Sequence, residues 1–137
     1  MPTIAALDLA TDTRLRATGL QVFAYQLPDE ASTPDGPYLV YMPDPGIVGP
    51  SAILAQGATR ADWSCRVMIV TWTIEALRAT RESLRGALTG WTPTGDTQRV
   101  QPFREAPGPT LIDGPRGDRR LSQTIEFRTT ATITQEV

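Results

Sequence analysis

Residues 64–90 have the pattern of a strand that runs directly into a helix, and this change of period constrains the fold more than any other feature. Residues 64–72 are rich in β-branched and aromatic side chains, which fit the pleated, half-buried surface of a sheet. From residue 73 onward, apolar side chains recur at helical spacing with arginine and glutamate between them. These side chains are Ile74, Leu77, Leu84 and Leu88. The pattern predicts a strand over residues 64–72 and a helix over residues 73–89.

Both faces of this predicted strand carry apolar residues. Val67 and Ile69 point to one face, whereas Met68, Val70 and Trp72 point to the other, because successive side chains alternate across a strand. A strand that is apolar on both faces is covered on at least part of each. The segment therefore predicts a central strand, to which the remaining strands are added.

Residues 121–134 alternate almost strictly between apolar and polar side chains. Ile125, Phe127 and Ile133 fall on one face, and Glu126 and Arg128 fall on the other. This alternation predicts one long strand with one covered and one solvated face. Such a strand would span roughly 45 Å, which is long for a small domain and leaves room for one end to overhang the sheet and pair with something else.

Weaker patterns predict the remaining elements. Thr3 can cap a helix that Gly19 ends, and the segments around Phe23, Val40 and Val100 are apolar and short. These elements are a helix over residues 3–18 and strands over residues 21–26, 38–42 and 97–103.

Residues 43–62 and 106–120 are rich in proline, glycine and aspartate and show no clear periodicity, which predicts two long loops. Taken in order, these elements predict an α+β fold, with a mostly antiparallel β-sheet, two helices packed on one face and the two long loops. A length of 137 residues favours a single domain over residues 1–137.

The chain contains no histidine and a single cysteine, Cys65. Within one chain this excludes histidine-based triads, cysteine–histidine nucleophile pairs and zinc sites made of cysteine and histidine. Apart from Asp8 and Asp12 in the predicted N-terminal helix, the aspartates lie in predicted loops, where they commonly bond their own backbone, and no calcium-loop or phosphate-loop motif occurs. We therefore expect no catalytic residues, no metal site, no cofactor and no enzymatic activity.

The formal net charge is −2, with 13 basic and 15 acidic residues. This balance gives no global attraction to nucleic acid or to anionic membranes. No window approaches the run of about 20 apolar residues that a membrane span needs, and no secretory signal is visible. We therefore expect no membrane partner.

Two groups of residues are candidates for contacts with a neighbouring subunit or another partner. The first group is apolar, and its side chains either pack on the core or contact a partner. The second group is basic and either contacts an anion or nucleic acid, or belongs to a solvated turn whose charge Asp113 and Asp118 offset, which is the interpretation we favour. The two groups are Ile47, Val48, Ile53 and Leu54, and Arg116, Arg119 and Arg120.

The order and spacing of five segments resemble the tail terminator, or tail-completion, proteins of long-tailed bacteriophages. The resemblance extends over about residues 3–134, and the order, spacing and size carry it together. The segments are Gly36-Pro37-Tyr38-Leu39-Val40, Ala61-Asp62-Trp63-Ser64, the apolar strand over residues 66–72 that ends at Trp72, the helix over residues 74–88, and the alternating strand over residues 121–129.

This resemblance implies a structural virion protein at the head–tail junction, assembled in the cytoplasm of the host cell. Members of the family typically form a hexameric ring that caps the tail tube, stops its elongation and joins it to the head connector. The implied partners are other copies of the chain, the major tail tube protein and the head–tail connector or head-completion protein. DNA would only pass through the lumen of the ring. The family has no enzymatic residues to carry over.

Two other functions stay open at this point. One is a head-completion or neck protein that joins head and tail. The other is a small ligand-binding or enzymatic domain that uses carboxylates and arginine.

Overall fold

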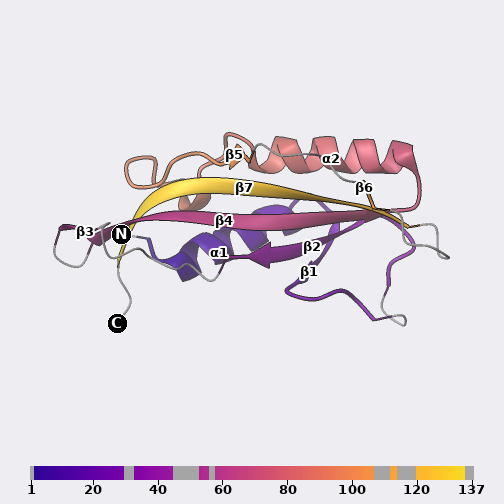
Figure 1. Cartoon of the computed structure of the whole chain (residues 1–137), viewed down its shortest axis with the longest axis horizontal. Helices are drawn as coiled ribbons and strands as arrows, with labels where there is room; N and C mark the ends of the chain where they lie inside the picture. The colour runs from indigo at the N-terminus through magenta and orange to yellow at the C-terminus, as the bar shows by residue number, and fades with distance from the viewer. Residues whose placement is uncertain are drawn as a thin grey trace.

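The computed structural model describes residues 2–29, 33–44, 53–55, 58–106, 112–113 and 120–134, with the backbone alone for 53–55, 58–59, 112–113 and 134. In chain order, the elements of the described part are α1 (Ile4–Arg16), β1 (Gln21–Ala24), β2 (Tyr38–Pro43), β3 (Ile53–Ala55), β4 (Ala58–Thr71), α2 (Ile74–Leu88), the short 3₁₀ helix η3 (Pro93–Gly95), β5 (Arg104–Glu105), β6 (Ile112–Asp113) and β7 (Leu121–Thr134) (Figure 1).

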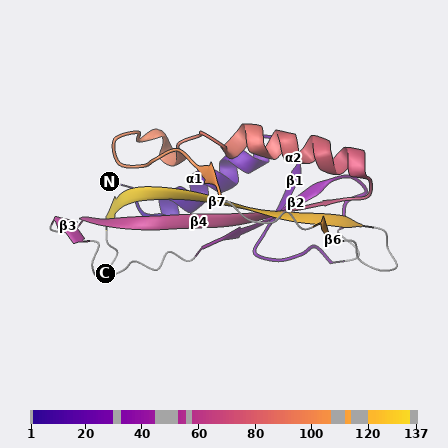
Figure 2. The ribbon, with the colours of Figure 1, turned by 45° about the horizontal axis from the view of Figure 1, so that its top comes forward.

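The described strands form one sheet in the order β1-β2-β4-β7-β5, with β3 beside β4 and β6 beside β7. β1 and β2 run parallel, and the other pairings are antiparallel. Both helices lie on the same side of the sheet (Figure 2), where Leu7 of α1 and Leu84 of α2 join one core with inward residues of β4 such as Val67. The predicted α+β class, with a mostly antiparallel sheet and helices on one face, is confirmed, and β4 is the central strand.

β4 and β7 pair with each other over their whole length. Each strand has 14 residues, and the register runs from Ala58 opposite Thr134 to Thr71 opposite Leu121. The predicted strand over residues 121–134 is therefore confirmed at both ends, but β7 does not overhang β4. The reason is that β4 begins six residues before the predicted start at Ser64, so the predicted loop over residues 43–62 contains both β3 and the start of β4.

Short segments cover much of the other edge of β7. Arg104 of β5 lies opposite Arg128, and Ile112 of β6 lies opposite Gln123. Val100 forms a single bridge to Ala131. The predicted loop over residues 106–120 therefore contains a short strand, and an edge that could otherwise pair with another chain is largely occupied.

The predicted strand over residues 97–103 is wrong. The side chain of Asp96 accepts hydrogen bonds of 3.2 Å from the backbone N–H groups of Gln98 and Arg99, which closes a turn in place of extended backbone. Pro102 has no N–H to donate to a ladder. Regular pairing therefore begins only at Arg104.

Both helices begin at a threonine cap. The side chains of Thr3 and Thr73 accept hydrogen bonds of 3.1 Å from the N–H groups of Ala6 and Ala76. Such a cap satisfies one of the N–H groups that lack a partner in the first turn of a helix. The two predicted helices are confirmed to within two residues at each end.

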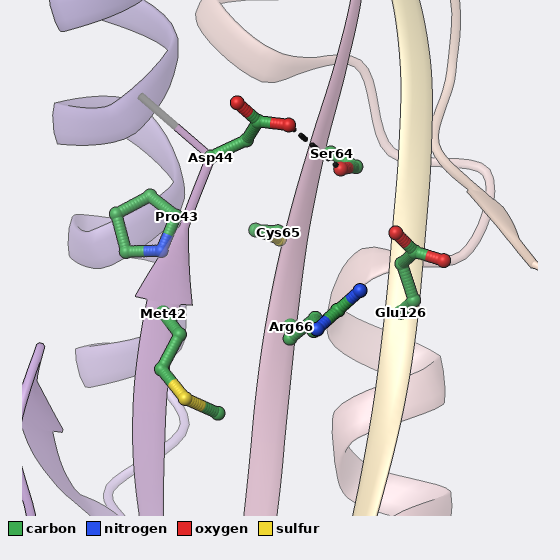
Figure 3. Close-up of a pocket in the computed structure, with 7 residues that line it drawn as sticks. All are labelled: Met42, Pro43, Asp44, Ser64, Cys65, Arg66 and Glu126. Atoms are coloured by element: carbon green, nitrogen blue, oxygen red, sulfur yellow. Dashed lines mark hydrogen bonds between the residues drawn. The ribbon is translucent and has the colours of Figure 1, made fainter. Parts of the chain in front are cut away.

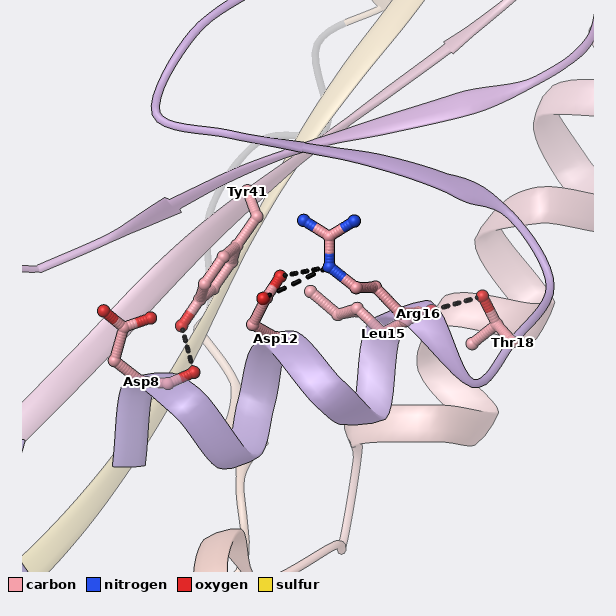
Figure 4. A network of polar contacts seen from close by, with 6 residues as sticks. All are labelled: Asp8, Asp12, Leu15, Arg16, Thr18 and Tyr41. Atoms are coloured by element: carbon pink, nitrogen blue, oxygen red, sulfur yellow. Dashed lines mark hydrogen bonds and ion pairs between the residues drawn. The ribbon is translucent and has the colours of Figure 1, made fainter. Parts of the chain in front are cut away.

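Polar contacts connect α1 to its surroundings (Figure 4). The Tyr41 hydroxyl of β2 donates to the backbone oxygen of Asp8 at 3.4 Å, and the Arg16 side chain bonds Asp12 one turn earlier at 3.1 Å. The Arg14 Nε donates to the backbone oxygen of Ala87 at 3.0 Å, close to the C-terminal end of α2. These contacts orient α1 against both the sheet and α2.

Alkaline pH is expected to destabilise the fold through two buried groups. Burial raises the pKa of the Cys65 thiol to about 12, and burial also raises the pKa of the Tyr41 hydroxyl. Both groups stay neutral in the folded state, whereas the unfolded chain ionises them near their ordinary pKa values. Their contribution to stability is therefore complete below about pH 8.5 and is lost as the pH rises toward 12, at up to about 1.4 kcal/mol per pH unit for each group.

Urea denaturation at pH 8 and pH 10 measures this effect, with Cys65→Ala as the control. Between these pH values the free energy of unfolding of the parent chain is expected to fall by about 1–2 kcal/mol more than that of the variant. The chain has no lysine, so no lysine titrates in this range. An equal fall of the free energy of unfolding in both proteins would show that the folded state does not raise the pKa of the Cys65 thiol.

Candidate functional site

The face of the sheet that points away from α1 and α2 is the candidate functional site. We call it the open sheet face, and it consists of the outward residues of β1, β2, β4, β5 and β7. Its apolar members form a cluster separate from the main core. Both helices pack on the opposite face (Figure 2), so within the described part of the chain the open sheet face carries no helix.

One end of the open sheet face is apolar and aromatic. The Phe23 and Tyr38 rings meet edge to face with centroids 5.6 Å apart, and the Tyr38 and Trp72 centroids are 6.2 Å apart. Tyr38 is buried, whereas Phe23, Met68 and Trp72 are only partly buried. The buried Tyr38 is therefore surrounded by side chains that remain partly accessible. We call this end the aromatic end; its members are Phe23, Tyr38, Val40, Met42, Met68, Val70 and Trp72.

The other end of the open sheet face is polar and hollowed. Two adjoining depressions of about 380 and 290 Å³ lie there, and Asp44, Ser64 and Glu126 line both. Figure 3 shows the first depression, in which Arg66 and Glu126 extend from neighbouring strands. This end can make many hydrogen bonds to a partner, and Met42 and Pro43 add apolar surface to its first depression.

The carboxylates of the polar end accept bonds from neighbouring side chains of the same chain. Arg128 forms a 3.0 Å ion pair with Glu126, and the Thr130 hydroxyl donates to Asp62 at 2.8 Å. The Ser64 hydroxyl donates to Asp44 at 3.5 Å. These bonds fix the positions of the three carboxylates along the polar end.

Among the described residues, no group of three or more histidine, cysteine, aspartate or glutamate side chains could hold a metal ion. None of the described helices is long and apolar enough to cross a membrane.

Only one of the contact residues predicted from the sequence can be placed with its side chain. Arg120 lies directly before β7, and its Nη1 donates to the Tyr38 hydroxyl at 3.3 Å. This contact brings it to the aromatic end of the open sheet face. Ile53 and Leu54 belong to β3 beside the start of β4, where only their backbone is described. Ile47, Val48, Arg116 and Arg119 lie outside the described residues.

The open sheet face itself was missed at the sequence level. The outward side chains Met68, Val70 and Trp72 were visible as an apolar face of the predicted central strand. That pattern indicated cover on at least part of each face. The predicted packing of both helices on one face left the other face without a helix, but the pattern alone did not identify that face as a candidate site.

Comparison with known proteins gives a structural match. No protein-family model matches the sequence, and no curated protein matches it. A chain in the structure of the virion of a native gene transfer agent (GTA) particle superposes with a TM-score of 0.66 at 16% sequence identity, covering 93% of this chain and 96% of that chain. The protein shares its fold with a virion component.

A second structure is more distant. It is the sheath/tube terminator, in the extended state, of an extracellular contractile injection system called PVC, with a TM-score of 0.47 and 16% identity. The match covers all of this chain but only 58% of that chain.

Proposed function

We propose that this protein is a tail terminator, a structural virion protein whose copies form a ring, expected to be a hexamer, on the end of a tail tube. The ring stops elongation of the tube and joins it to the head connector, and DNA passes through its lumen. The partners in this proposal are other copies of the chain, the major tail tube protein and the connector or head-completion protein. The proposal includes no catalytic activity.

One observation carries the proposal: the shared fold covers nearly the whole of both chains, and the other chain is part of a virion. The match is therefore not limited to a small motif embedded in an unrelated protein. Fold similarity alone leaves many functions open, so the surface of this chain has to be considered as well.

The open sheet face has the composition of a protein interface. Aromatic residues, methionine and arginine are enriched in interfaces, and the aromatic end contains Phe23, Trp72 and Met68, all partly exposed. Large rings that are held in place but remain partly accessible are the side chains that most often dominate binding energy. A face of this kind, which none of the described helices covers, supports a role in assembly.

Polymerisation of the matching tail tube protein tests the proposal. With this protein added during polymerisation, we expect tubes of limited length, each carrying a ring at one end in negative-stain images. Without it, the tubes should grow to variable lengths. Binding to the connector without any effect on tube length would instead identify a neck protein, and absence from both assemblies would contradict a role at the head–tail junction.

A further inference from the structure

The outer edge of β1 carries unpaired backbone groups. The Tyr25 N–H donates to the Tyr41 oxygen of β2 at 2.8 Å, and the backbone groups of successive residues in a strand point to opposite edges. The N–H and C=O groups of Val22 and Ala24 therefore point away from β2. β1 is the outermost strand in the sheet order, and these groups have no hydrogen-bond partner among the residues that the structure describes. Such an edge is a template for one more strand.

The edge of β1 lacks most of the features that protect a sheet edge from pairing. Charged side chains, proline, β-bulges or a covering segment usually give that protection. β1 has the sequence Gln-Val-Phe-Ala and pairs with β2 without a shift in register. At the other end of the strand order, the N–H groups of Gln101 and Ala106 donate to β7 oxygens at 2.9 Å. Of these two edges, β1 is therefore the one open to another strand.

Exposed apolar side chains lie close to this edge. Three of the four exposed large apolar side chains in the described part of the chain are Leu9, Tyr25 and Leu27, which are 67%, 67% and 60% exposed. Tyr25 directly follows β1, and its hydroxyl donates at 2.8 Å to Asp8, the neighbour of Leu9 in α1. Exposed apolar side chains that gather in one place mark interaction sites. They add contact area to a strand that has only four residues.

The backbone of Tyr25 indicates that this exposure is specific. Its φ is +70°, a left-handed conformation that is unusual for a bulky residue. Backbone strain of this kind is kept where the surrounding structure imposes it, often at functional positions. Here it ends β1 and holds a large ring at the surface beside the unpaired edge.

We infer that β1 pairs with β1 of a second copy, antiparallel and around a two-fold axis. Two identical edges of this kind are self-complementary, because each offers the same donors and acceptors in the same order. Residues with outward backbone groups must face each other, so Val22 lies opposite Ala24 of the second copy and Ala24 lies opposite its Val22. This register satisfies all the unpaired groups of both strands.

The same register places Phe23 opposite Phe23 of the second copy. Phe23 points to the open sheet face, where it is a partly buried member of the aromatic end. Its own backbone groups face β2, so the two Phe23 residues form a non-hydrogen-bonded pair, in which side chains come closest. Aromatic cross-strand pairs stabilise a sheet. The aromatic ends of the two copies thereby become one continuous surface.

This contact goes beyond the proposed ring and does not rest on it. A two-fold contact closes after two copies, whereas a ring needs contacts that run head to tail. The two contacts therefore use different surfaces. The free protein is a dimer in solution before it meets a tube.

A symmetric disulfide tests the register. The Cα atoms of a non-hydrogen-bonded pair lie about 4.5 Å apart, which is within the range that a disulfide spans. Mild oxidation should therefore convert most of the Phe23→Cys variant into a covalent dimer on a non-reducing gel. Gln21→Cys is the matched control on the same face of the same strand. Its counterpart lies roughly 13 Å further along the paired strand, so it should stay unlinked, and the buried Cys65 should not react in either variant.

Proline at the unpaired edge provides a second measurement. Ala24→Pro removes an N–H that has no partner within the chain, and proline is tolerated at such a position of an edge strand. Each copy then loses one bond to the other, so the dissociation constant of the dimer, measured by sedimentation equilibrium, should rise about tenfold or more. Ala24→Ser keeps the N–H and should dimerise like the parent chain. Circular dichroism checks that all the variants are folded.

Three results would overturn the two-fold contact. The first is a parent chain that stays monomeric at the highest concentration, and the second is a Phe23→Cys variant that links no better than Gln21→Cys. The third is association that Ala24→Pro leaves unchanged. Tube length is measured separately, so a dimer with this register that leaves tubes unlimited in length would retain the contact and refute the terminator role.

Discussion

Trp63→Ala is expected to lower the free energy of unfolding by about 3–5 kcal/mol. The Trp63 side chain is completely buried and is the largest of the fully buried side chains that the structure describes. Its ring lies 6.0 Å from that of Phe103, and its Nε1–H donates to the Asp44 oxygen at 3.0 Å. Truncation therefore removes apolar contacts, leaves a cavity and removes the partner of a backbone carbonyl.

Urea denaturation at pH 7 measures this loss, and Trp72→Ala is the matched control. Trp72 is also a tryptophan close to the centre of the chain, but it is only partly buried, on the open sheet face. Its truncation should cost less than half as much stability as that of Trp63. Equal losses in the two variants would show that the open sheet face is as much a part of the core as the helix face.

Trp72→Ala is expected to impair assembly strongly, although it costs little stability. If the aromatic end contacts the tube, loss of this ring should weaken binding to tube ends by about 30-fold or more, since an aromatic anchor at an interface typically contributes 2 kcal/mol or more. The neighbouring Tyr38, 6.2 Å away, would keep its position in the sheet. The chain should therefore remain folded while it fails to cap.

The measurement is the fraction of tube ends that carry a ring, counted at several protein concentrations. Arg78→Ala on α2 serves as the control for a surface truncation away from the open sheet face. Normal capping by Trp72→Ala, at concentrations where the parent protein is only half-bound, would exclude the aromatic end from the tube contact.

The strongly periodic segments of the fold could be predicted from the sequence. β7 alternates because its inward residues, such as Phe127, are buried while Arg128 is exposed, and this difference in solvation is what the pattern records. α2 was predictable for the same reason, with Leu77 and Leu84 on its buried side. Where the difference between buried and exposed side chains sets the period of the pattern, the local sequence is sufficient to predict the element.

The start of β4 could not be predicted, because its inward and outward side chains differ too little in hydrophobicity to give a clear alternation. Ala61 is small, so only Trp63 marks the buried face in this part of the strand, and Arg60 and Asp62 resemble loop residues. The short strands β3, β5 and β6 have two or three residues each. Such strands form because a long partner strand is present, which is information that the local sequence does not contain.

The candidate site was predictable only in part. Arg120 was identified from a basic cluster, and the structure places it on Tyr38. The Arg104–Arg128 pair was missed because it depends on the register between β5 and β7. Residues that are far apart in sequence become neighbours only through the topology of the sheet.

The β4–β7 ladder also has a consequence for how the chain folds. α2, η3, β5 and β6 lie between the two strands in sequence, so this pairing cannot grow outward from a tight turn. The entropy of closing a long loop must be lost before the ladder gains any hydrogen bonds, which makes folding slow. Until β7 pairs, the edge of β4 is open to strands of other chains. The speed of this one non-local pairing therefore determines how much newly made protein reaches the native state instead of aggregating.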